Sequence, residues 1–437
     1  MLEQVNQLLV YQNISETSIL KQLALLQKEY YGNLITREEA VTRVYEQIHN
    51  LLDVATTYGF NHNLWQNYLT YLLVTTETPF SISSEKVGEL SGSVNLLAKR
   101  DFAIFKNLFT YDFAELEEAL QVDCFSILLN YQSVAKLETT YNRNVSERIL
   151  ELSNKLNDAN TVEEFGRYVT TFYKEYGVGM LGLNKAFRIE KQEGKPALLP
   201  ITNTELVTFK DIIGYETQKQ KLKENTEAFL AGKKANNVLL FGDSGTGKST
   251  SIKALINEYY EEGLRIIEIY KHQFEDLAKV ISMIKNRNYK FIIYMDDLSF
   301  EEFEIEYKYL KAVIEGGLEI KPNNVLIYAT SNRRHLIRET WSDRSDIKTD
   351  ELHHSDTMQE KLSLVARFGI TIHYGKPNKT QFNQIVLHLA RRHKEIMLSD
   401  EEIYALANQW ELSHGGMSGR CASQLISYLL GKEPLTQ

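Results

Sequence analysis

Three glycines stand close to a lysine and a serine near the middle of the chain, in the segment Gly242-Asp243-Ser244-Gly245-Thr246-Gly247-Lys248-Ser249. The spacing matches the pattern GxxxxGK followed by serine or threonine. Glycines at these positions let the backbone curl so that successive N–H groups point at phosphate oxygens. We expect Lys248 to place a cation against the β- and γ-phosphates of a nucleotide, and the Ser249 hydroxyl to ligate Mg²⁺.

The residues on either side of this segment fit the same chemistry. Val238–Phe241 indicates a buried strand before it, and Thr250–Tyr260 indicates a helix after it. The helix N-terminus favours negative charge, so Thr250 joins the phosphate-binding set. A chance match to the pattern is expected in roughly 2% of chains of this length. The flanking strand and helix lower that frequency several-fold, so we interpret the segment as a triphosphate site.

Two adjacent acids, Asp296 and Asp297, follow the apolar stretch Phe291–Met295. Acids at the C-terminal end of a strand, downstream of a P-loop, form the Walker B pattern. Asp296 would hold Mg²⁺ opposite Ser249, and Asp297 would polarise the attacking water. The alternative is a solvated loop, which is also the better interpretation of Glu301 and Glu302. Asp297 is one methylene shorter than the glutamate common at this position, which shortens its reach toward the water.

The elements that position these groups form an α/β pattern. Strand-like stretches alternate with helical ones at Val238–Phe241, Arg265–Tyr270, Phe291–Met295, Val325–Thr330 and Ile370–Tyr374. This alternation predicts a five-stranded parallel sheet with helices on both faces, over residues 205–375. Residues 376–437 are predicted to form a small helical lid domain, with helices at Asn378–Lys394, Ser399–Leu412 and Ser418–Leu430.

The first part of the chain has a different pattern. Apolar residues spaced by three and four, such as Leu20, Leu23 and Leu26, predict an all-α N-terminal domain over residues 1–188. Its tyrosines fit helix packing better than a base-stacking surface. Residues 189–204 contain two prolines and a glycine among polar residues, and this composition predicts an interdomain linker.

Composition limits the function classes. The chain has 437 residues, 43% of them hydrophobic, and a net charge of −9, which argues against nucleic-acid binding along its whole length. Its two cysteines, Cys124 and Cys421, give no disulfide framework and no metal-ligand cluster. We see no secretory signal and no apolar stretch approaching the roughly 18 residues that span a bilayer. We therefore expect a cytoplasmic protein with no membrane association.

From about residue 205 onward, roughly half of the chain resembles the AAA+ ATPases. Val207–Tyr215, with Phe209 and Ile213, is similar to the family's first segment, which packs on adenine. Tyr328–Asn332 resembles the sensor-1 motif, Leu362–Gly369 the segment with the arginine finger, and Gly416–Arg420 the sensor-2 motif. Residues 291–344 are more closely similar to an uncharacterised bacterial family of ATP-binding AAA+ proteins.

The resemblance implies roles for three residues. Asn332 would hold the water or the γ-phosphate, Arg420 would lie over the phosphates, and Arg367 would enter the ATP site of a neighbouring subunit. It also implies ATP and Mg²⁺ as cofactors, hydrolysis of ATP to ADP and phosphate, and a homo-oligomeric ring, with a hexamer as the expected size.

Each assignment has a structural alternative. Asn332 could serve only as a turn residue, Arg420 as a helix-start arginine, and Phe209 and Ile213 as core residues. Arg367 could form a structural ion pair, and its rivals as the finger are Arg333, Arg334, Arg338 and Arg344. His353-His354 fits a solvated pair better than a metal chelate. Arg391-Arg392-His393-Lys394 fits a charged helix end better than a nucleic-acid contact.

Three functions remain open at this point. The favoured one is a remodelling ATPase that acts on an unknown protein client, with the N-terminal domain as adaptor. The second is a DNA-associated loader or initiator, because acidic pairs such as Asp296-Asp297 also occur in the AAA+ proteins of that class. The third is a low-turnover nucleotide switch, motivated by the short side chain of Asp297. A small-molecule kinase would leave Asn332, Arg367 and Arg420 without a role.

Overall fold

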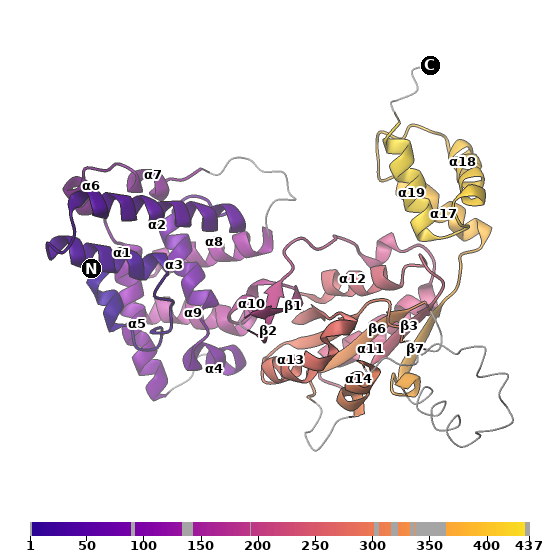
Figure 1. Ribbon diagram of the computed structural model, residues 1–437, viewed down its shortest axis with the longest axis horizontal. Coiled ribbons are helices and arrows are strands. Elements are labelled where there is room, and N and C mark those ends of the chain that lie inside the picture. Colours follow the sequence, from indigo (N-terminus) through magenta and orange to yellow (C-terminus); the bar gives the residue numbers. More distant parts are fainter. Residues whose placement is uncertain are drawn as a thin grey trace. The chain divides into compact units, whose positions relative to one another are not determined.

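The computed structural model describes residues 2–88, 92–132, 143–192, 194–300, 306–315, 322–332, 336 and 364–432. The chain divides into two compact units, one of Met1–Lys185 with Pro200–Asn203 and one of Ala186–Leu199 with Thr204–Gln437 (Figure 1). Across these described ranges, every helix is too short or too polar to cross a membrane.

Over the described part of residues 2–185, the regular elements of the first unit are helices, as the spacing of apolar residues predicts. One large cluster of buried side chains, including Leu20, Phe105 and Phe165, forms its core. The elements are η1 (Leu2–Gln7), α1 (Ile19–Tyr31), α2 (Arg37–Tyr58), α3 (Leu64–Thr75), α4 (Pro79–Val87), α5 (Ser93–Phe109), α6 (Ala114–Leu120), α7 (Phe125–Leu129), α8 (Arg143–Asp158), α9 (Val162–Tyr176) and α10 (Met180–Leu183).

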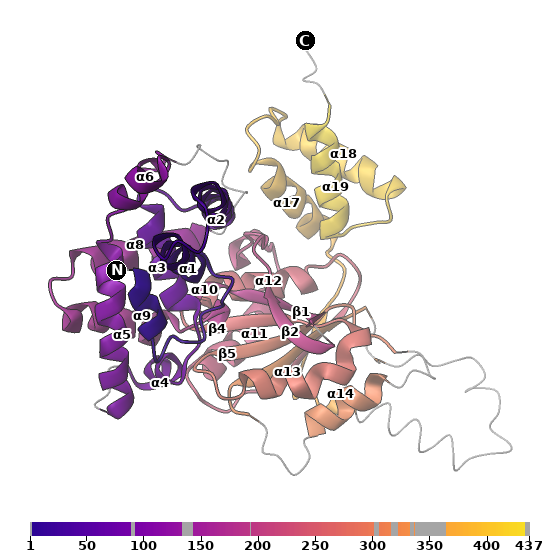
Figure 2. The same cartoon turned by 60° about the vertical axis from the view of Figure 1, so that its left-hand side comes forward.

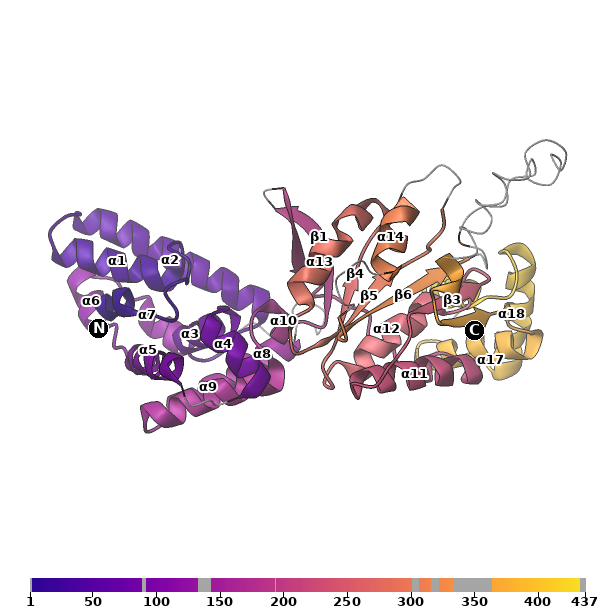
Figure 3. The ribbon, with the colours of Figure 1, turned by 90° about the horizontal axis from the view of Figure 1, so that it is seen from below.

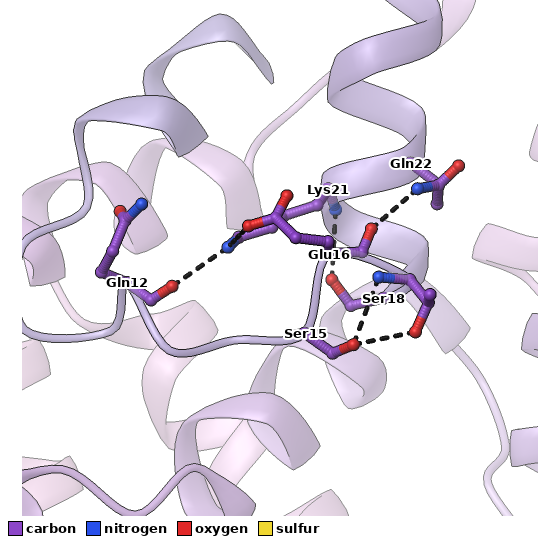
Figure 4. Close-up of polar contacts among 7 residues, drawn as sticks. Gln12, Ser15, Glu16, Ser18, Lys21 and Gln22 are labelled. Carbon is purple, nitrogen blue, oxygen red and sulfur yellow. Dashed lines mark hydrogen bonds and ion pairs between the residues drawn. The ribbon is translucent and has the colours of Figure 1, made fainter.

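The start of α1 shows how local sequence fixes a helix end in this unit (Figure 4). Ser18 is the N-cap, and its hydroxyl accepts a hydrogen bond from the Lys21 backbone N–H. The Lys21 side chain is only 8% exposed, and its ammonium donates to the Gln12 carbonyl at 3.0 Å and to Glu16 at 2.7 Å. A buried charge is tolerated here because both partners compensate its lost hydration.

The second unit is built on a seven-stranded sheet in the order β2-β1-β4-β5-β6-β3-β7. The five predicted strands are consecutive and parallel in this order, and two further strands extend the sheet beyond β4. The bounds are β1 (Ala186–Gln192), β2 (Lys195–Pro200), β3 (Val238–Gly242), β4 (Leu264–Glu268), β5 (Lys290–Met295), β6 (Val325–Ser331) and β7 (Ile370–Tyr374). β1 pairs in parallel with β4, with Ala186 opposite Ile266.

The predicted linker over residues 189–204 is therefore wrong in its first part, because β1 and β2 occupy residues 186–192 and 195–200. Gly194, with a φ of 76°, lies between the two strands in a conformation that favours glycine. Prolines 196 and 200 are compatible with β2 because it is an edge strand, where some backbone N–H groups have no ladder partner. The glycine and the two prolines of this segment therefore belong to a β-hairpin and not to a linker.

Helices cover both faces of the sheet. α11 (Glu216–Leu230) and α12 (Lys248–Tyr259) lie on one side, and α13 (Leu277–Ile284) and α14 (Glu306–Glu315) lie on the other (Figure 3). Leu222, Ile252 and Leu255 of the first pair are buried together with alternate residues of the strands. Two short 3₁₀ helices, η2 (Phe209–Asp211) and η3 (Lys271–Asp276), complete the core.

Three helices form a small C-terminal domain, as predicted, and appear as one group in Figure 2. They are α17 (Lys379–Ala390), α18 (Asp400–Ser413) and α19 (Gly419–Leu430). Each begins at a capping side chain, supplied by Asn378, Ser399 and Ser418 respectively. Phe382, Ile403 and Leu425 belong to their common core, which is separate from the core beneath the sheet.

Candidate nucleotide-binding site

The glycine-rich segment turns sharply between β3 and α12. Gly242, Gly245 and Gly247 have φ angles of 138°, 73° and 91°, which side chains rarely adopt. A Cβ on Gly242 would lie 2.1 Å from the Tyr374 carbonyl oxygen. The backbone of the loop can therefore curl only with glycines at these positions, and it leads directly into the N-terminus of α12.

Lys248, the first residue of α12, is 7% exposed and extends back across the loop. Its ammonium donates to the carbonyls of Gly242 and Asp243 at 3.0 and 2.6 Å, and to Asn332 Oδ1 at 3.0 Å. Burial lowers the pKa of Lys248, and the nearby carboxylates of Asp297, Asp243 and Asp296 oppose that shift. The lysine is thus a fixed cation on the concave side of the loop.

Strand alternation brings the other polar groups to the same face of the sheet. Tyr294 on β5 and Tyr328 on β6 pair in register and pack under α11 and α12. Residues two positions further along a strand point to the same side, which places Asp296, Thr330 and Asn332 beside α12. The carboxyl ends of neighbouring parallel strands therefore deliver these groups next to Lys248.

Asp296 is the hydrogen-bonding centre of the site. Its Oδ1 accepts from Ser249 at 2.7 Å, from Tyr294 at 2.6 Å and from Thr330 at 2.5 Å. Burial acts to raise the pKa of Asp296, but the hydrogen bonds from Thr330, Tyr294 and Ser249 outweigh it and lower the pKa below its ordinary value. The carboxylate is therefore ionised at neutral pH and in contact with the serine hydroxyl.

Asp297 and Asn332 are joined on the other side of this centre. Asp297 has a φ of 50°, unusual for a residue other than glycine, and its N–H donates to Thr330 Oγ1 at 2.9 Å. Asn332 Nδ2 donates to Asp297 Oδ1 at 2.7 Å while its Oδ1 accepts from Lys248. Thr330 thus contacts both acids, and Asn332 connects the second acid to the lysine.

The helical domain reaches the phosphate loop through the start of α19. The N–H of Gly419 donates to the Gly245 carbonyl at 2.8 Å, and Arg420 lies beside Ser244 with an Nη1–Oγ distance of 3.5 Å. A Cβ on Gly245 would lie 3.1 Å from Ser418 Oγ and from Arg420 Cβ. The close approach places the Arg420 guanidinium over the loop.

The connection between β7 and the helical domain also touches the loop. The Asp243 N–H donates to the Tyr374 carbonyl at 3.1 Å, and its Oδ2 accepts from the Lys376 N–H at 3.2 Å. The Tyr215 hydroxyl donates to the Gly375 carbonyl at 2.7 Å. Burial, followed by the charge of Asp243, raises the pKa of Tyr215 to about 12, so its hydroxyl keeps the proton for this bond.

Most of the phosphate loop, both acids, Asn332 and Arg420 line one cleft of about 720 Å³ between the sheet and the helical domain. One end is polar and includes Ser244–Thr250, Asp296, Asp297, Thr330, Asn332 and Arg420. The other end carries the apolar side chains of Val207, Ile212, Ile213, Ile385 and Leu389. A polar end with oriented cations joined to an apolar slot fits a nucleotide, with its phosphates on the loop and its base in the slot.

The residues also fit a magnesium ion. Mg²⁺ is usually held by one or two carboxylates together with substrate phosphates and waters. Asp296 and Ser249, already 2.7 Å apart, supply a carboxylate and a hydroxyl next to the phosphate loop. Over the described ranges, no group of three or more His, Cys, Asp or Glu side chains forms a separate metal site.

Arg367, which the sequence predicts as a site residue, lies away from the cleft. It precedes β7, whose first residue, Ile370, pairs with Val238 at the start of β3. The phosphate loop follows the opposite end of β3, four residues further at about 3.3 Å each. Arg367 instead forms a short ion pair with Glu315 at the end of α14. Its rivals Arg333, Arg334, Arg338 and Arg344 lie outside the described residues, as do His353 and His354.

The parallel strand order, the phosphate loop after β3, the acids after β5, the asparagine after β6 and the adjoining helical domain define an AAA+ P-loop protein. Residues 183–433 match a family described as protein of unknown function, DUF815. The match covers more than half of the chain, and the chain belongs to that family. No curated protein matches it.

Solved structures with a similar fold include RuvB of Thermotoga maritima, a Holliday junction branch migration motor. It is 18% identical, and the alignment covers 50% of this chain and 63% of that chain with a TM-score of 0.35. A substituted form of the same RuvB is 16% identical, with 51% and 72% of the two chains covered and a TM-score of 0.34. This chain thus spans less than two thirds of the first RuvB chain, and the description as a branch migration motor applies to that RuvB.

Sequence reasoning missed several groups that the structure brings into the site. Thr330 and Tyr294 both donate to Asp296, and each lies two residues before a recognised site residue on its strand. That spacing was the available signal, because side chains two apart on a strand share a face. Asp211 and Arg392 also line the cleft, and no local pattern pairs residues so far apart.

Proposed function

We propose that this protein binds ATP with Mg²⁺ in the cleft and hydrolyses it to ADP and phosphate. The observation that carries the proposal is the hydrogen bond from Ser249 to Asp296 at 2.7 Å. Next to it, two further hydrogen bonds connect Lys248 to Asn332 and Asn332 to Asp297. One arrangement thereby supplies a metal-binding pair, a phosphate-binding cation and a carboxylate that can receive a proton from water.

Each side chain has a distinct part in this proposal. Lys248 and the loop N–H groups bind the phosphates, and Arg420 adds a cation from the helical domain. Bound Mg²⁺ supplies neutralising charge on the phosphate oxygens. Asp297 orients the attacking water and takes its proton, while Asn332 holds the Asp297 carboxylate in place. The apolar slot with Ile213 excludes water around the base.

We further propose that Arg367 acts on the site of a neighbouring copy of the chain. It lies just before β7, at the opposite end of the strands from its own phosphate loop, and four strand residues separate the two ends by about 13 Å. That separation supports a role in trans over a role in its own site. A homo-oligomeric ring then completes each site, and we take a hexamer as the working size.

The proposed biological role is remodelling of a protein client, with the separate helical unit as the adaptor. The net charge of −9 supports this role over a DNA loader. A low-turnover switch is the second candidate, because Asp297 is short and its carboxylate is already bonded to Asn332. Measured turnover separates the two: a remodelling ATPase turns over at rates on the order of 1 s⁻¹ or faster.

The experiment compares the full chain with its Lys248→Ala variant. We expect magnesium-dependent binding of a fluorescent ATP analogue and phosphate release by the full chain, and neither activity in the variant. Lys279→Ala is the matched control, because Lys279 lies on α13, on the other face of the sheet, and pairs with Asp276. Equal nucleotide binding by the full chain and Lys248→Ala would remove the proposal.

A further inference from the structure

Two adjacent arginines at the end of α17 have different partners. Arg391 forms an ion pair with Asp400 at the start of α18, so its contact stays within the helical domain. Arg392 Nη1 lies 2.9 Å from Asp211 Oδ1 in η2, so its contact joins the helical domain to the core. Both Arg392 and Asp211 line the nucleotide cleft. The sequence interpretation of a charged helix end therefore does not account for Arg392.

Asp211 is held ready for this contact by its neighbours in the core. Its Oδ2 accepts from the Thr208 N–H at 2.7 Å and from the Thr208 hydroxyl at 2.9 Å, which leaves Oδ1 for Arg392. Burial acts to raise the pKa of Asp211, but the bonds from Thr208 and the charges of Arg392 and His388 lower it overall. The carboxylate is thus a fixed anion, and its side chain is only 19% exposed.

The ion pair lies at the apolar end of the cleft. Ile385, Leu389 and Arg392 are spaced by four and three residues, which puts them on one face of the helix end. On the core side, Ile212 and Ile213 directly follow Asp211. The two apolar pairs form the walls of the slot, and the guanidinium and carboxylate connect those walls.

We propose that Arg392 and Asp211 form a clasp that closes the helical domain over the base and ribose of a bound nucleoside triphosphate. This inference rests on the proposed function. Arg392 is a positioning residue here: it sets nucleotide affinity and takes no part in phosphate chemistry, which occurs at the other end of the cleft. Without a nucleotide, the Arg392 side chain is 48% exposed. A nucleotide in the slot would shield the ion pair from water and so strengthen the attraction between the two charges.

The test measures binding of Mg·ATP and of Mg·tripolyphosphate, which has the phosphates without base or ribose, by calorimetry. Arg392→Gln should weaken ATP binding about two- to fivefold and raise KM, with kcat at saturating ATP within about twofold. Its affinity for tripolyphosphate should equal that of the unsubstituted chain. Arg391→Gln is the matched control and should change none of these values. Arg392→Lys, which keeps the charge, should recover part of the affinity.

The pairing itself is tested by a double-mutant cycle. Asp211→Asn keeps an oxygen for Thr208 and should weaken ATP binding as Arg392→Gln does, and the double variant should be no weaker than either. The clasp would be overturned if the two substitutions lowered ATP affinity additively, or if Arg391→Gln lowered it as much as Arg392→Gln does. It would also be overturned if Arg392→Gln lowered tripolyphosphate affinity by the same factor as ATP affinity. Failure of the unsubstituted chain to bind ATP at all would instead overturn the proposed function. Thermal unfolding of each variant identifies any that does not fold.

Discussion

The side-chain amide of Asn332 donates a hydrogen bond to the Asp297 carboxylate across 2.7 Å. Asp297 has a φ of 50°, so its backbone is held in the left-handed region by its surroundings. The same Asn332 side chain accepts a hydrogen bond from Lys248 at 3.0 Å. The acid that would activate water and the lysine that would bind phosphate are therefore coupled through one amide, and movement of either changes the position of the other.

This geometry predicts that Asp297→Asn slows ATP hydrolysis by about 10²–10⁴ while nucleotide affinity is retained. The substituted amide cannot take a proton from water, but it leaves the loop, Lys248 and Asp296 in place. Single-turnover phosphate release and equilibrium ATP binding, measured on the same preparation, check the two parts. Unchanged hydrolysis would exclude Asp297 as the base. The variant is also the best trap for a client, because it should remain in the ATP-bound state.

Thr330 is predicted to contribute to both stability and metal affinity. Its hydroxyl donates to Asp296 and accepts from the Asp297 N–H, and the residue is 1% exposed. Thr330→Val keeps the shape but removes one of three donors to Asp296 and leaves the Asp297 N–H without its acceptor, so we expect a loss of about 1–3 kcal/mol in the free energy of unfolding. Mg²⁺ affinity should also fall. Thr330→Ser, which keeps the hydroxyl, should retain most of the Mg²⁺ affinity in the same titration.

The lowered pKa of Asp296 predicts a defined dependence of stability on acidity. A carboxyl with a lower pKa in the folded chain stabilises the fold above its ordinary pKa of 3.8. This contribution is lost as the pH falls below that value and through the lower pKa of the folded state. The unfolding free energy of the unsubstituted chain should therefore fall faster below pH ~4 than that of Asp296→Asn. Parallel curves from urea titrations across pH 3–6 would contradict this assignment.

Five of the seven strands can be predicted from the sequence, whereas β1 and β2 at one end of the sheet cannot. Strands β3 to β7 and the phosphate loop have local signals, because buried parallel strands form continuous apolar stretches and the loop needs glycines at fixed spacing. β1 and β2 have weaker signals: β2 contains Pro196 and Pro200 and lies at the sheet edge. The composition that suggested a linker also suits an edge hairpin, and only the pairing of β1 with β4 decides between them.

The candidate site shows the same division. Asp296, Asp297 and Asn332 were predicted because each follows its strand directly, where parallel strands deliver side chains to one edge. Thr330 lies inside β6, and its signal is only the two-residue spacing to Asn332 directly after that strand, although it contacts both acids. The pairing of Asp211 with Arg392 depends on how the helical domain meets the core. Such a contact between distant segments is a tertiary property that periodicity and motif spacing do not encode.

The placement of Arg367 predicts that two inactive variants restore activity when mixed. Lys248→Ala cannot bind the triphosphate but retains Arg367, whereas Arg367→Ala retains a complete phosphate loop at the other end of β3. If Arg367 acts in a neighbouring site, mixed assemblies contain sites with both groups, and phosphate release should rise well above that of either variant alone. A trans arginine contributes about 10³–10⁵ in rate in GTPases, so even a minority of such sites is measurable.

Glu315→Gln removes the ion-pair partner of Arg367 and controls for a purely structural role: it should stay active if Arg367 works in trans. A mixture no more active than its components, under conditions where light scattering shows mixed assemblies, would assign Arg367 to that ion pair alone.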